Sequence, residues 1–364
     1  MADQQLRQFG SAVKESIIDL PRSVPRYIYN RFPILKWLPR YNPSWAIRDA
    51  IAGITVALIV VPQGMSYSKV AGLPVQHGLY SAYIGAIFYC FMGTSKDLTI
   101  GPTAVISLIT AALVNELQGK LTPQEVAAVS CLLVGAFTFA LGFLRLGIIL
   151  DFFPNTVLTG YTTGAAATIL ISQLPKLIGV QGVNNRDPPY TVIYNTCKNL
   201  PNAKWLDAVF GVVAFVLLIL IGLAVDRWGR GKFSIQMIKI SRFCTVAILA
   251  TIISYLIHIG APVDAKGEVI AKISILKNVP KGLPPPMVPP VTWDLFTHIV
   301  PKLVAILLAT ILEHIAIGKA FARRNRYKIE TDQELLALGA ANVTASFFGA
   351  YCVTGSFSRS AVKV

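Results

Sequence analysis

Charged residues are scarce in this chain: they make up 14% of its 364 residues, against about 25% in a typical soluble domain. Acidic residues are the minority among them, with 18 Asp and Glu against 33 Lys and Arg, so the formal net charge is +15. Hydrophobic residues account for 54% of the sequence, and the mean hydropathy is +0.58. This composition excludes an ordinary soluble domain and favours one polytopic membrane domain.

Several common functional signals are missing from the sequence. The five cysteines are scattered and form no CxxC pair, so neither a disulfide framework nor a metal site is expected. No nucleophile–base pair, metal cluster or phosphate loop is visible, so we expect no enzyme activity and no cofactor. Residues 1–45 hold no apolar stretch with a cleavage site, which excludes a secretory signal and assigns membrane insertion to the first apolar segment.

The basic residues lie between apolar runs and not along one face, which argues against nucleic acid as a partner. If residues 1–45 form a cytosolic tail, the inner connections carry about twice as many Lys and Arg as the outer ones. The distribution therefore predicts a cytosolic N-terminus and the lipid bilayer as a partner.

Nine apolar segments and the start of a tenth are expected to be helical, giving an all-α fold. They lie at about 48–68, 78–93, 102–116, 123–144, 155–178, 205–225, 241–260, 295–318 and 333–350, with the tenth beginning near 356. The third is short and follows Gly101-Pro102, and the tenth follows Thr354-Gly355. Both are therefore candidate half-helices that begin within the bilayer.

Other features are interpreted structurally. The stretch "GLPPPMVPP" within 261–294 predicts a non-helical external connection. The sequon at Asn342 is discounted because it lies in an apolar segment, and Asp151 and Asp207 are interpreted as interfacial. The small residues of the fifth segment, including Gly160 and Gly164, predict close helix packing.

Polar residues in the first segment suggest a binding face. Gln63 and Tyr67 are four residues apart and share one side of a helix, and at membrane depth they need partners or a water-filled cavity. The alternative is a kink at Pro62 whose polar neighbours bond to adjacent helices.

The two half-helix starts suggest an anion site. Pro102 suits the first position of a helix, which would leave Thr103 and Ala104 with free N–H groups and a positive helix end. In "TGSFSRSAVKV" the chain would approach in extended form, and a helix beginning near Phe357 would present Ser358 and Arg359. The alternative is an ordinary helix cap followed by a snorkelling arginine.

Glu313 lies inside the eighth segment, where an ionised carboxylate needs a proton or a cationic partner. It could bind a transported proton, or form a structural pair with Arg359, and the two roles are compatible. His314 is interpreted as a packing or interfacial residue.

Four stretches together resemble the sulfate permease (SulP) family of anion transporters. They are "VPQGMSYSKVAGLPVQHGLYSA", "GTSKDLTIGPTAVISL", "LEHIAIGKAFARRNRYKIETDQELLALGAANV" and "TGSFSRSAV", and the resemblance runs from about residue 33 to the last residue. It implies fourteen membrane segments in two inverted repeats of seven, followed by a cytosolic STAS domain. Segments 1–4 and 8–11 would form a core, segments 5–7 and 12–14 a gate, and the anion would bind between segments three and ten.

By this resemblance, Gln63, Tyr67, Thr103, Ala104, Phe357, Ser358 and Arg359 bind the substrate, and Glu313 couples transport to protons. The implied organisation is a tail (1–45), core segments (46–145), gate segments (146–260), an external loop (261–294) and further core segments (295–364). The second half of the membrane domain and STAS are absent from this sequence, so we expect a truncated transporter.

The predicted function is secondary active, proton-coupled sulfate uptake, with sulfate and protons as partners. Two alternatives stay open: an exchanger of chloride, bicarbonate or oxalate, and a truncated membrane protein that does not transport. The plasma membrane is the expected location because no organellar address is visible. Homodimer formation is left open.

Overall fold

The structure is a computed structural model that describes residues 29, 31–117, 121–147, 155–180, 182–184, 187–228, 233–259, 273, 279–280, 282–291 and 293–363. Residues 1–28, most of 261–281 and Asp151 therefore lie outside the described residues, and the predictions made for them are not tested.

The described chain is helical apart from two strands of two residues each. The long helices are α3 (Pro43–Ala71), α4 (Val75–Met92), α5 (Ala104–Glu116), α6 (Pro123–Phe143), α8 (Asn155–Leu177), α10 (Trp205–Trp228), α11 (Phe233–His258), α12 (Trp293–Arg324) and α13 (Thr331–Ser346). The short elements are α2 (Ile34–Trp37), η1 (Leu38–Arg40), β1 (Ile100–Gly101), α9 (Pro189–Lys198), η2 (Leu200–Asn202), β2 (Thr354–Gly355) and α14 (Phe357–Lys363).

Each apolar segment expected from the sequence overlaps one of these helices. Four stretches are long and apolar enough to cross a membrane: Pro43–Ala71, Pro123–Phe143, Trp205–Arg227 and Leu303–Arg324. The expected half-helix of the third segment is α5, which has 13 residues and would span about 20 Å at 1.5 Å per residue. That is shorter than the hydrocarbon core of a bilayer, about 30 Å.

Helix α3 shows why the first segment folds as one long helix. The Asn42 side chain accepts a hydrogen bond from the Ser44 N–H, and Pro43 occupies the first turn, where its missing N–H is harmless. The helix continues through Pro62 and ends at Gly72, whose φ of 78° is left-handed. The alternative interpretation was a kink at Pro62, but this proline does not divide α3 into two helices.

Two close helix contacts depend on glycine. A side chain at Gly78 of α4 would collide with the Gly64 backbone of α3. A side chain at Gly339 of α13 would lie 2.4 Å from the backbone nitrogen of Phe139 in α6. Short side chains let these backbones approach closely, as is common at helix interfaces in membranes.

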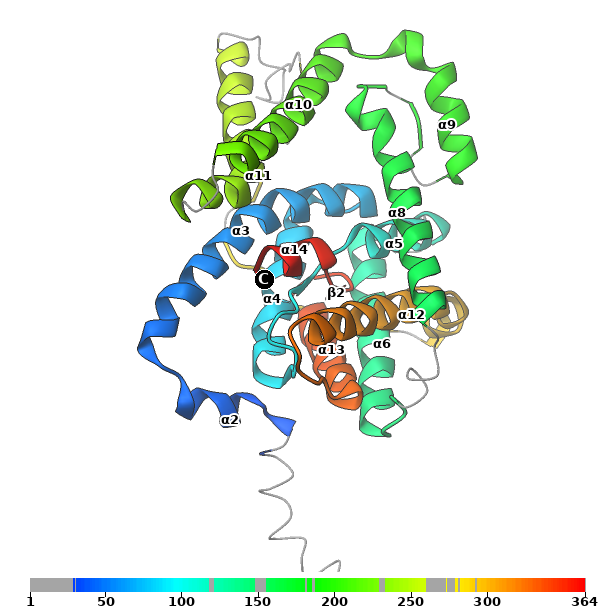
Figure 1. Cartoon of the computed structure of the whole chain (residues 1–364). Helices are drawn as coiled ribbons and strands as arrows, with labels where there is room; N and C mark the ends of the chain where they lie inside the picture. The colour runs from blue at the N-terminus through cyan, green and yellow to red at the C-terminus, as the bar shows by residue number, and fades with distance from the viewer. Residues whose placement is uncertain are drawn as a thin grey trace, which may run out of the picture.

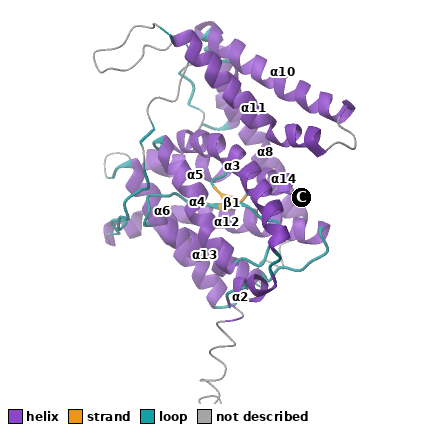
Figure 2. Cartoon of the chain, turned by 90° about the vertical axis from the view of Figure 1, so that its left-hand side faces the viewer, coloured by secondary structure: helices purple, strands orange, loops and turns teal. Residues whose placement is uncertain are grey.

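Two groups of helices occupy different ends of the molecule. Helices α4, α6, α12 and α13 pack together at one end, and α10 and α11 lie side by side at the other, with α3 between them (Figures 1 and 2). In the most apolar part of α10 only 11% is buried, whereas 61% of the most apolar part of α6 is buried.

Two small residues of α8, Gly160 and Gly164, have no close neighbour in the part of the chain that the structure describes. Nothing in that part lies within 4 Å of the Cβ position at either glycine. Among the described residues, none approaches this face of α8, so the close packing predicted for these glycines is not formed there.

The two strands cross near the centre of the molecule. Strand β1 pairs antiparallel with β2, Ile100 opposite Gly355 and Gly101 opposite Thr354. The contact continues on one side, where the Ser356 N–H donates to the Thr99 carbonyl at 2.9 Å and the Thr99 N–H donates to Ser360 Oγ at 2.9 Å. The pairing joins the starts of α5 and α14, which are far apart in the sequence.

Candidate functional site

The start of α5 is built from an extended strand and an uncapped helix end. Thr103 is the residue before the helix, with φ −123° and ψ 162°, and its side chain makes no hydrogen bond to the first turn. The N–H groups of the first helical turn have no partner within the helix, so this buried end is a potential anion-binding surface. The helix begins at Ala104 and not at Pro102 as the sequence suggested, because strand pairing keeps Gly101 extended.

Arg359 is the largest fully buried side chain of the described residues, with 0% of its surface exposed. Its Nη1 donates to the Pro102 carbonyl at 2.9 Å. Its Nε and Nη2 have no hydrogen-bond partner among the residues that the structure describes. A buried guanidinium with unused donors is costly, and an oxyanion is the natural ligand for such a planar, doubly donating group.

Gly101 provides the space for this guanidinium. A Cβ atom at Gly101 would lie 3.1 Å from Nη2 and 3.3 Å from Cζ of Arg359. That separation is tighter than most side-chain contacts, so a larger residue would push the guanidinium away from the strand. Gly101 thus lets the guanidinium approach the strand closely, and the Pro102 carbonyl accepts its hydrogen bond.

Glu313 of α12 reaches the same end of α5. The Thr103 hydroxyl donates to Glu313 Oε2 at 3.0 Å. Within the described part of the chain, no ion pair of 4.0 Å or less joins Glu313 to Arg359. A direct structural pair between them, one interpretation of the sequence, is therefore not formed here, and the carboxylate is held by a neutral hydroxyl.

Helix α3 contributes the remaining polar groups. Gln63 Oε1 is buried and has no hydrogen-bond partner, and Tyr67 lies one turn further along the same face. Tyr67 interacts electrostatically with both Arg359 and Glu313. The structure therefore brings Tyr67, Arg359, Glu313 and Thr103 into one cluster, as the sequence predicted.

Two predicted side chains lie elsewhere. Phe357 is 60% exposed, and its ring packs on Phe321 with the centroids 5.3 Å apart. Ser358 is also exposed, with its hydroxyl 3.4 Å from that of Ser356. The two residues begin α14 as expected, but in this structure only their backbone is left as a possible contribution to the site, because Arg359 occupies the inward face of the helix.

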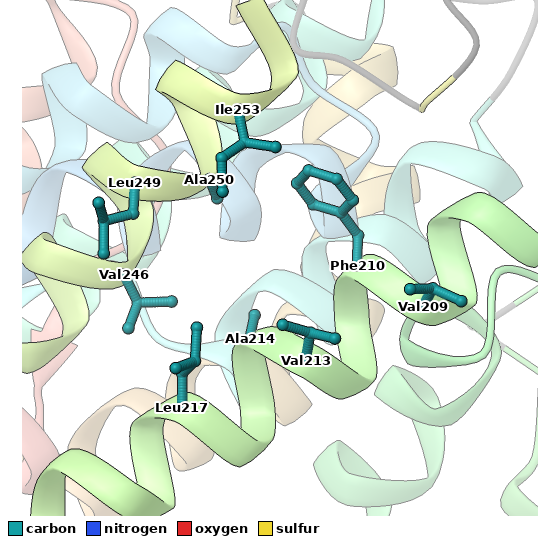
Figure 3. A pocket seen from close by; sticks show the side chains of 9 residues that line it. All are labelled: Val209, Phe210, Val213, Ala214, Leu217, Val246, Leu249, Ala250 and Ile253. Atoms are coloured by element: carbon teal, nitrogen blue, oxygen red, sulfur yellow. The ribbon is translucent and has the colours of Figure 1, made fainter. Parts of the chain in front are cut away.

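The cluster suits an anion better than a metal. Among the described residues, no group of three or more His, Cys, Asp and Glu is arranged to hold a metal ion. The unused groups of Arg359 are donors and the start of α5 is a positive helix end, and both attract negative charge. By contrast, the cavity of about 200 Å³ between α10 and α11 is lined only by apolar side chains, which offer an anion no donor (Figure 3).

Asn342 is a supporting residue that sequence reasoning passed over. Its Nδ2 donates to the carbonyls of Leu338 and Val353, both at 3.0 Å, and its Oδ1 accepts from the Val353 N–H at 2.8 Å. It thereby fixes the residue that precedes β2. The available signal was an amide within an apolar segment, which the sequon interpretation obscured.

A second missed cluster surrounds Glu334 of α13. Its carboxylate accepts hydrogen bonds from the Thr94 and Ser95 N–H groups at 2.7 and 2.9 Å, from the Tyr89 hydroxyl at 2.6 Å, and lies 2.9 Å from His314 Nε2. Both His314 and Glu334 are fully buried. Of the two interpretations of His314, packing is confirmed and an interfacial position is wrong, because Tyr89 of α4 and the segment with Thr94 and Ser95 enclose the pair together with α12 and α13.

The sequence comparisons identify the family of this chain. The model of the sulfate permease family matches residues 47–364. The chain is 43% identical to a probable sulfate permease of Schizosaccharomyces pombe, covering 93% of this chain and 40% of that protein. It is 41% identical to sulfate permease 2 of Saccharomyces cerevisiae, again over 93% and 40%. The chain thus spans about two fifths of the length of these relatives.

Solved structures share the fold. The structure of SLC26A9 matches with a TM-score of 0.79 at 24% identity, covering 95% of this chain and 54% of that one. The transmembrane domain of the cyanobacterial bicarbonate transporter BicA matches with a TM-score of 0.66 at 20% identity, over 87% and 75%. The chain is a multi-pass integral membrane protein with the fold of these transmembrane domains. It belongs to the sulfate permease family, a family of transporters and not of enzymes.

Proposed function

We propose that the protein to which this sequence belongs is a secondary active sulfate transporter that binds its anion beside Arg359. The observation that carries the proposal is the buried guanidinium, with Nε and Nη2 unpaired next to the uncapped start of α5. The names of the fungal relatives, which are sulfate permeases, support sulfate as the substrate. Gln63, Tyr67, Thr103 and Ala104 complete the proposed site, with backbone groups of Phe357 and Ser358.

We further propose that Glu313 carries a cotransported proton. An inside-negative potential opposes the entry of a dianion, because each elementary charge contributes about 2.3 kcal/mol per 100 mV. Two negative charges at 100 mV therefore meet about 4.6 kcal/mol of opposition, which bound protons would offset. Glu313 is suited to this role because the Thr103 hydroxyl, at the start of α5, donates to its carboxylate. Among the described residues, no direct ion pair with a cation holds this carboxylate, so it is free to take up a proton.

Uptake of labelled sulfate into transporter-deficient cells tests both proposals, using the full-length protein and the 364-residue chain. Uptake by the full-length protein should rise as external pH falls, and Glu313→Gln should remove that dependence. Thr310→Val, also on α12, is a matched control because the Thr310 hydroxyl has no partner. Sulfate uptake that ignores both pH and Glu313→Gln would refute proton coupling while leaving sulfate transport intact.

The same assay separates the alternatives. Stimulation of uptake by anion on the far side, without proton movement, would identify an exchanger of chloride, bicarbonate or oxalate. Absence of uptake by the 364-residue chain, together with its co-purification with a full-length relative, would identify a non-transporting membrane protein.

The remaining assignments are proposals as well. We infer a cytosolic N-terminus, a plasma-membrane location and a division into core segments (46–145 and 295–364) and gate segments (146–260). The packing of α12, α13 and α14 onto α3, α4, α5 and α6 supports this division. Cysteine accessibility on the two sides of the membrane would test the orientation, and cross-linking in membranes would test a homodimer.

A further inference from the structure

The segment that precedes the first spanning helix carries an unusual set of exposed aromatic and apolar side chains. The exposed fractions are 45% for Tyr29, 37% for Phe32, 43% for Leu35, 40% for Trp37, 54% for Leu38 and 49% for Trp45. Three of the rings form a ladder four residues apart: the centroids of Trp37 and Tyr41, and of Tyr41 and Trp45, are each separated by 6.0 Å. The ladder runs from the last residue of α2, past η1 and Asn42, into α3.

Cationic side chains alternate with these rings. Lys36, Arg40 and Arg48 are all exposed, and the Lys36 ammonium lies 5.9 Å from the centroid of the Tyr29 ring. Among the described residues, no carboxylate lies within 4.0 Å of Lys36, Arg40 or Arg48. The nearby acidic residue, Asp49, accepts a hydrogen bond from the Tyr41 hydroxyl, and that hydrogen bond raises the pKa of the phenol, so Tyr41 stays neutral.

The segment is fixed at one end of the helix bundle. Gln333, in the first turns of α13, donates to the Arg31 carbonyl at 2.8 Å and to the Met92 carbonyl at 2.9 Å, and it accepts from Arg31 Nη1 at 3.1 Å. Figure 2 shows α2 at the same end of the molecule as α13, and α2 contacts α4. The basic connection between α12 and α13, with Arg326 and Lys328, lies at this same end.

We propose that residues 29–48, the interfacial segment, lie on the surface of the bilayer and bind anionic phospholipid headgroups. Aromatic rings with an apolar body and a polar edge favour the membrane–water interface. Cations near an anionic leaflet add an attraction equivalent to about five-fold in binding each. The exposed Ile47 and Ile54 on α3, at 68% and 62%, continue this apolar surface into the hydrocarbon region. Because the exposed side chains of this segment are cationic, we expect anionic lipids of the leaflet that it faces to bind there.

Quenching of tryptophan by brominated lipid tests the proposal on the whole chain in nanodiscs. The chain has five tryptophans, so the signal of Trp37 and Trp45 is taken as the difference from the Trp37→Phe/Trp45→Phe variant. We expect brominated phosphatidylserine to quench this signal more than brominated phosphatidylcholine at low salt. High salt should reduce the difference because it screens exposed charges.

A matched pair of variants isolates the charges. The excess is the additional quenching by brominated phosphatidylserine over brominated phosphatidylcholine. Lys36→Gln/Arg40→Gln should remove most of this excess, since each charge accounts for about five-fold in binding. Lys198→Gln/Lys204→Gln removes two exposed cations from the distant α9 region and should leave the excess unchanged. Equal quenching by both lipids, or an excess that survives Lys36→Gln/Arg40→Gln, would overturn the proposal. Protection of Trp37 from both lipids would overturn it too, by indicating that protein covers the segment. None of these outcomes depends on sulfate transport.

Discussion

Replacing Asn342 by Ala is expected to destabilise the fold and also to weaken the pairing of β1 with β2. The side chain makes four hydrogen bonds, two of them to Val353 and one each to Leu338 and Cys131, and both Asn342 and Val353 are fully buried. Val353 is not part of the β1–β2 pairing, so the substitution leaves its N–H and C=O without these partners. Each buried, unsatisfied group costs about 1–3 kcal/mol, and two give a loss of about 2–6 kcal/mol in the free energy of unfolding.

Thr344→Ala is the matched control on the same helix. The Thr344 hydroxyl donates only to the Ala340 carbonyl of its own helix, which keeps its backbone partner when the hydroxyl is lost. The expected cost is about 0.5–1.5 kcal/mol, that of one ordinary hydrogen bond. The control therefore removes a polar group from the same helix without removing support from the residue before β2.

Thermal unfolding of the purified chain in detergent, followed by intrinsic fluorescence, provides the measurement. Midpoints should be compared at one heating rate, because unfolding of large proteins is often irreversible. Asn342→Ala should lower the midpoint at least twice as much as Thr344→Ala. It should also weaken sulfate binding, since β2 positions Arg359. Equal midpoints for the two variants would refute the reasoning that Asn342 holds the strand.

Three further predictions concern the site and its support. Arg359→Lys should weaken binding of labelled sulfate at least about ten-fold, because Lys cannot offer the paired donors of a guanidinium; unchanged binding would remove Arg359 from the site. Gly101→Ala should weaken sulfate binding because the new Cβ would crowd Nη2 of Arg359. Gly53→Ala is the control, since nothing lies within 4 Å of its Cβ position, and it should leave binding unchanged. Equal effects of the two variants would contradict the steric argument. Glu334→Gln should lower the free energy of unfolding by about 1–3 kcal/mol, because the amide cannot accept all the hydrogen bonds that the buried carboxylate accepts. An unchanged midpoint of thermal unfolding would show that these hydrogen bonds do not stabilise the fold.

The sequence predicted the helices and the central cluster well because both leave local traces. Apolar runs locate the helices, and the glycine of Thr354-Gly355 marks the extended approach to α14. Polar residues inside apolar helices, such as Glu313 and Arg359, are rare enough to indicate a site. Those signals need no knowledge of which helix faces which.

What the sequence could not predict depends on tertiary contacts. The hydroxyl of Thr103 was available as a helix cap, but it bonds to Glu313, which lies 210 positions away. Nothing near His314 in the sequence indicates Glu334 as its partner, because the two meet only when α12 packs on α13. The hydroxyl of Ser358 was expected to donate to the anion, but it is exposed because Arg359 takes the inward side of α14.

The crossing of β1 and β2 also has a consequence for biosynthesis. Pro102 and Arg359, which bond to each other, are 257 positions apart. At 5–20 residues per second, about 10–50 s separate their synthesis on the ribosome. Throughout that interval the edge of β1 has no partner strand, although unpaired backbone groups are unfavourable in lipid. The nascent chain must therefore shelter residues 99–102 in a polar environment until residues 354–360 have been made, so the anion site is among the last parts of this region to assemble.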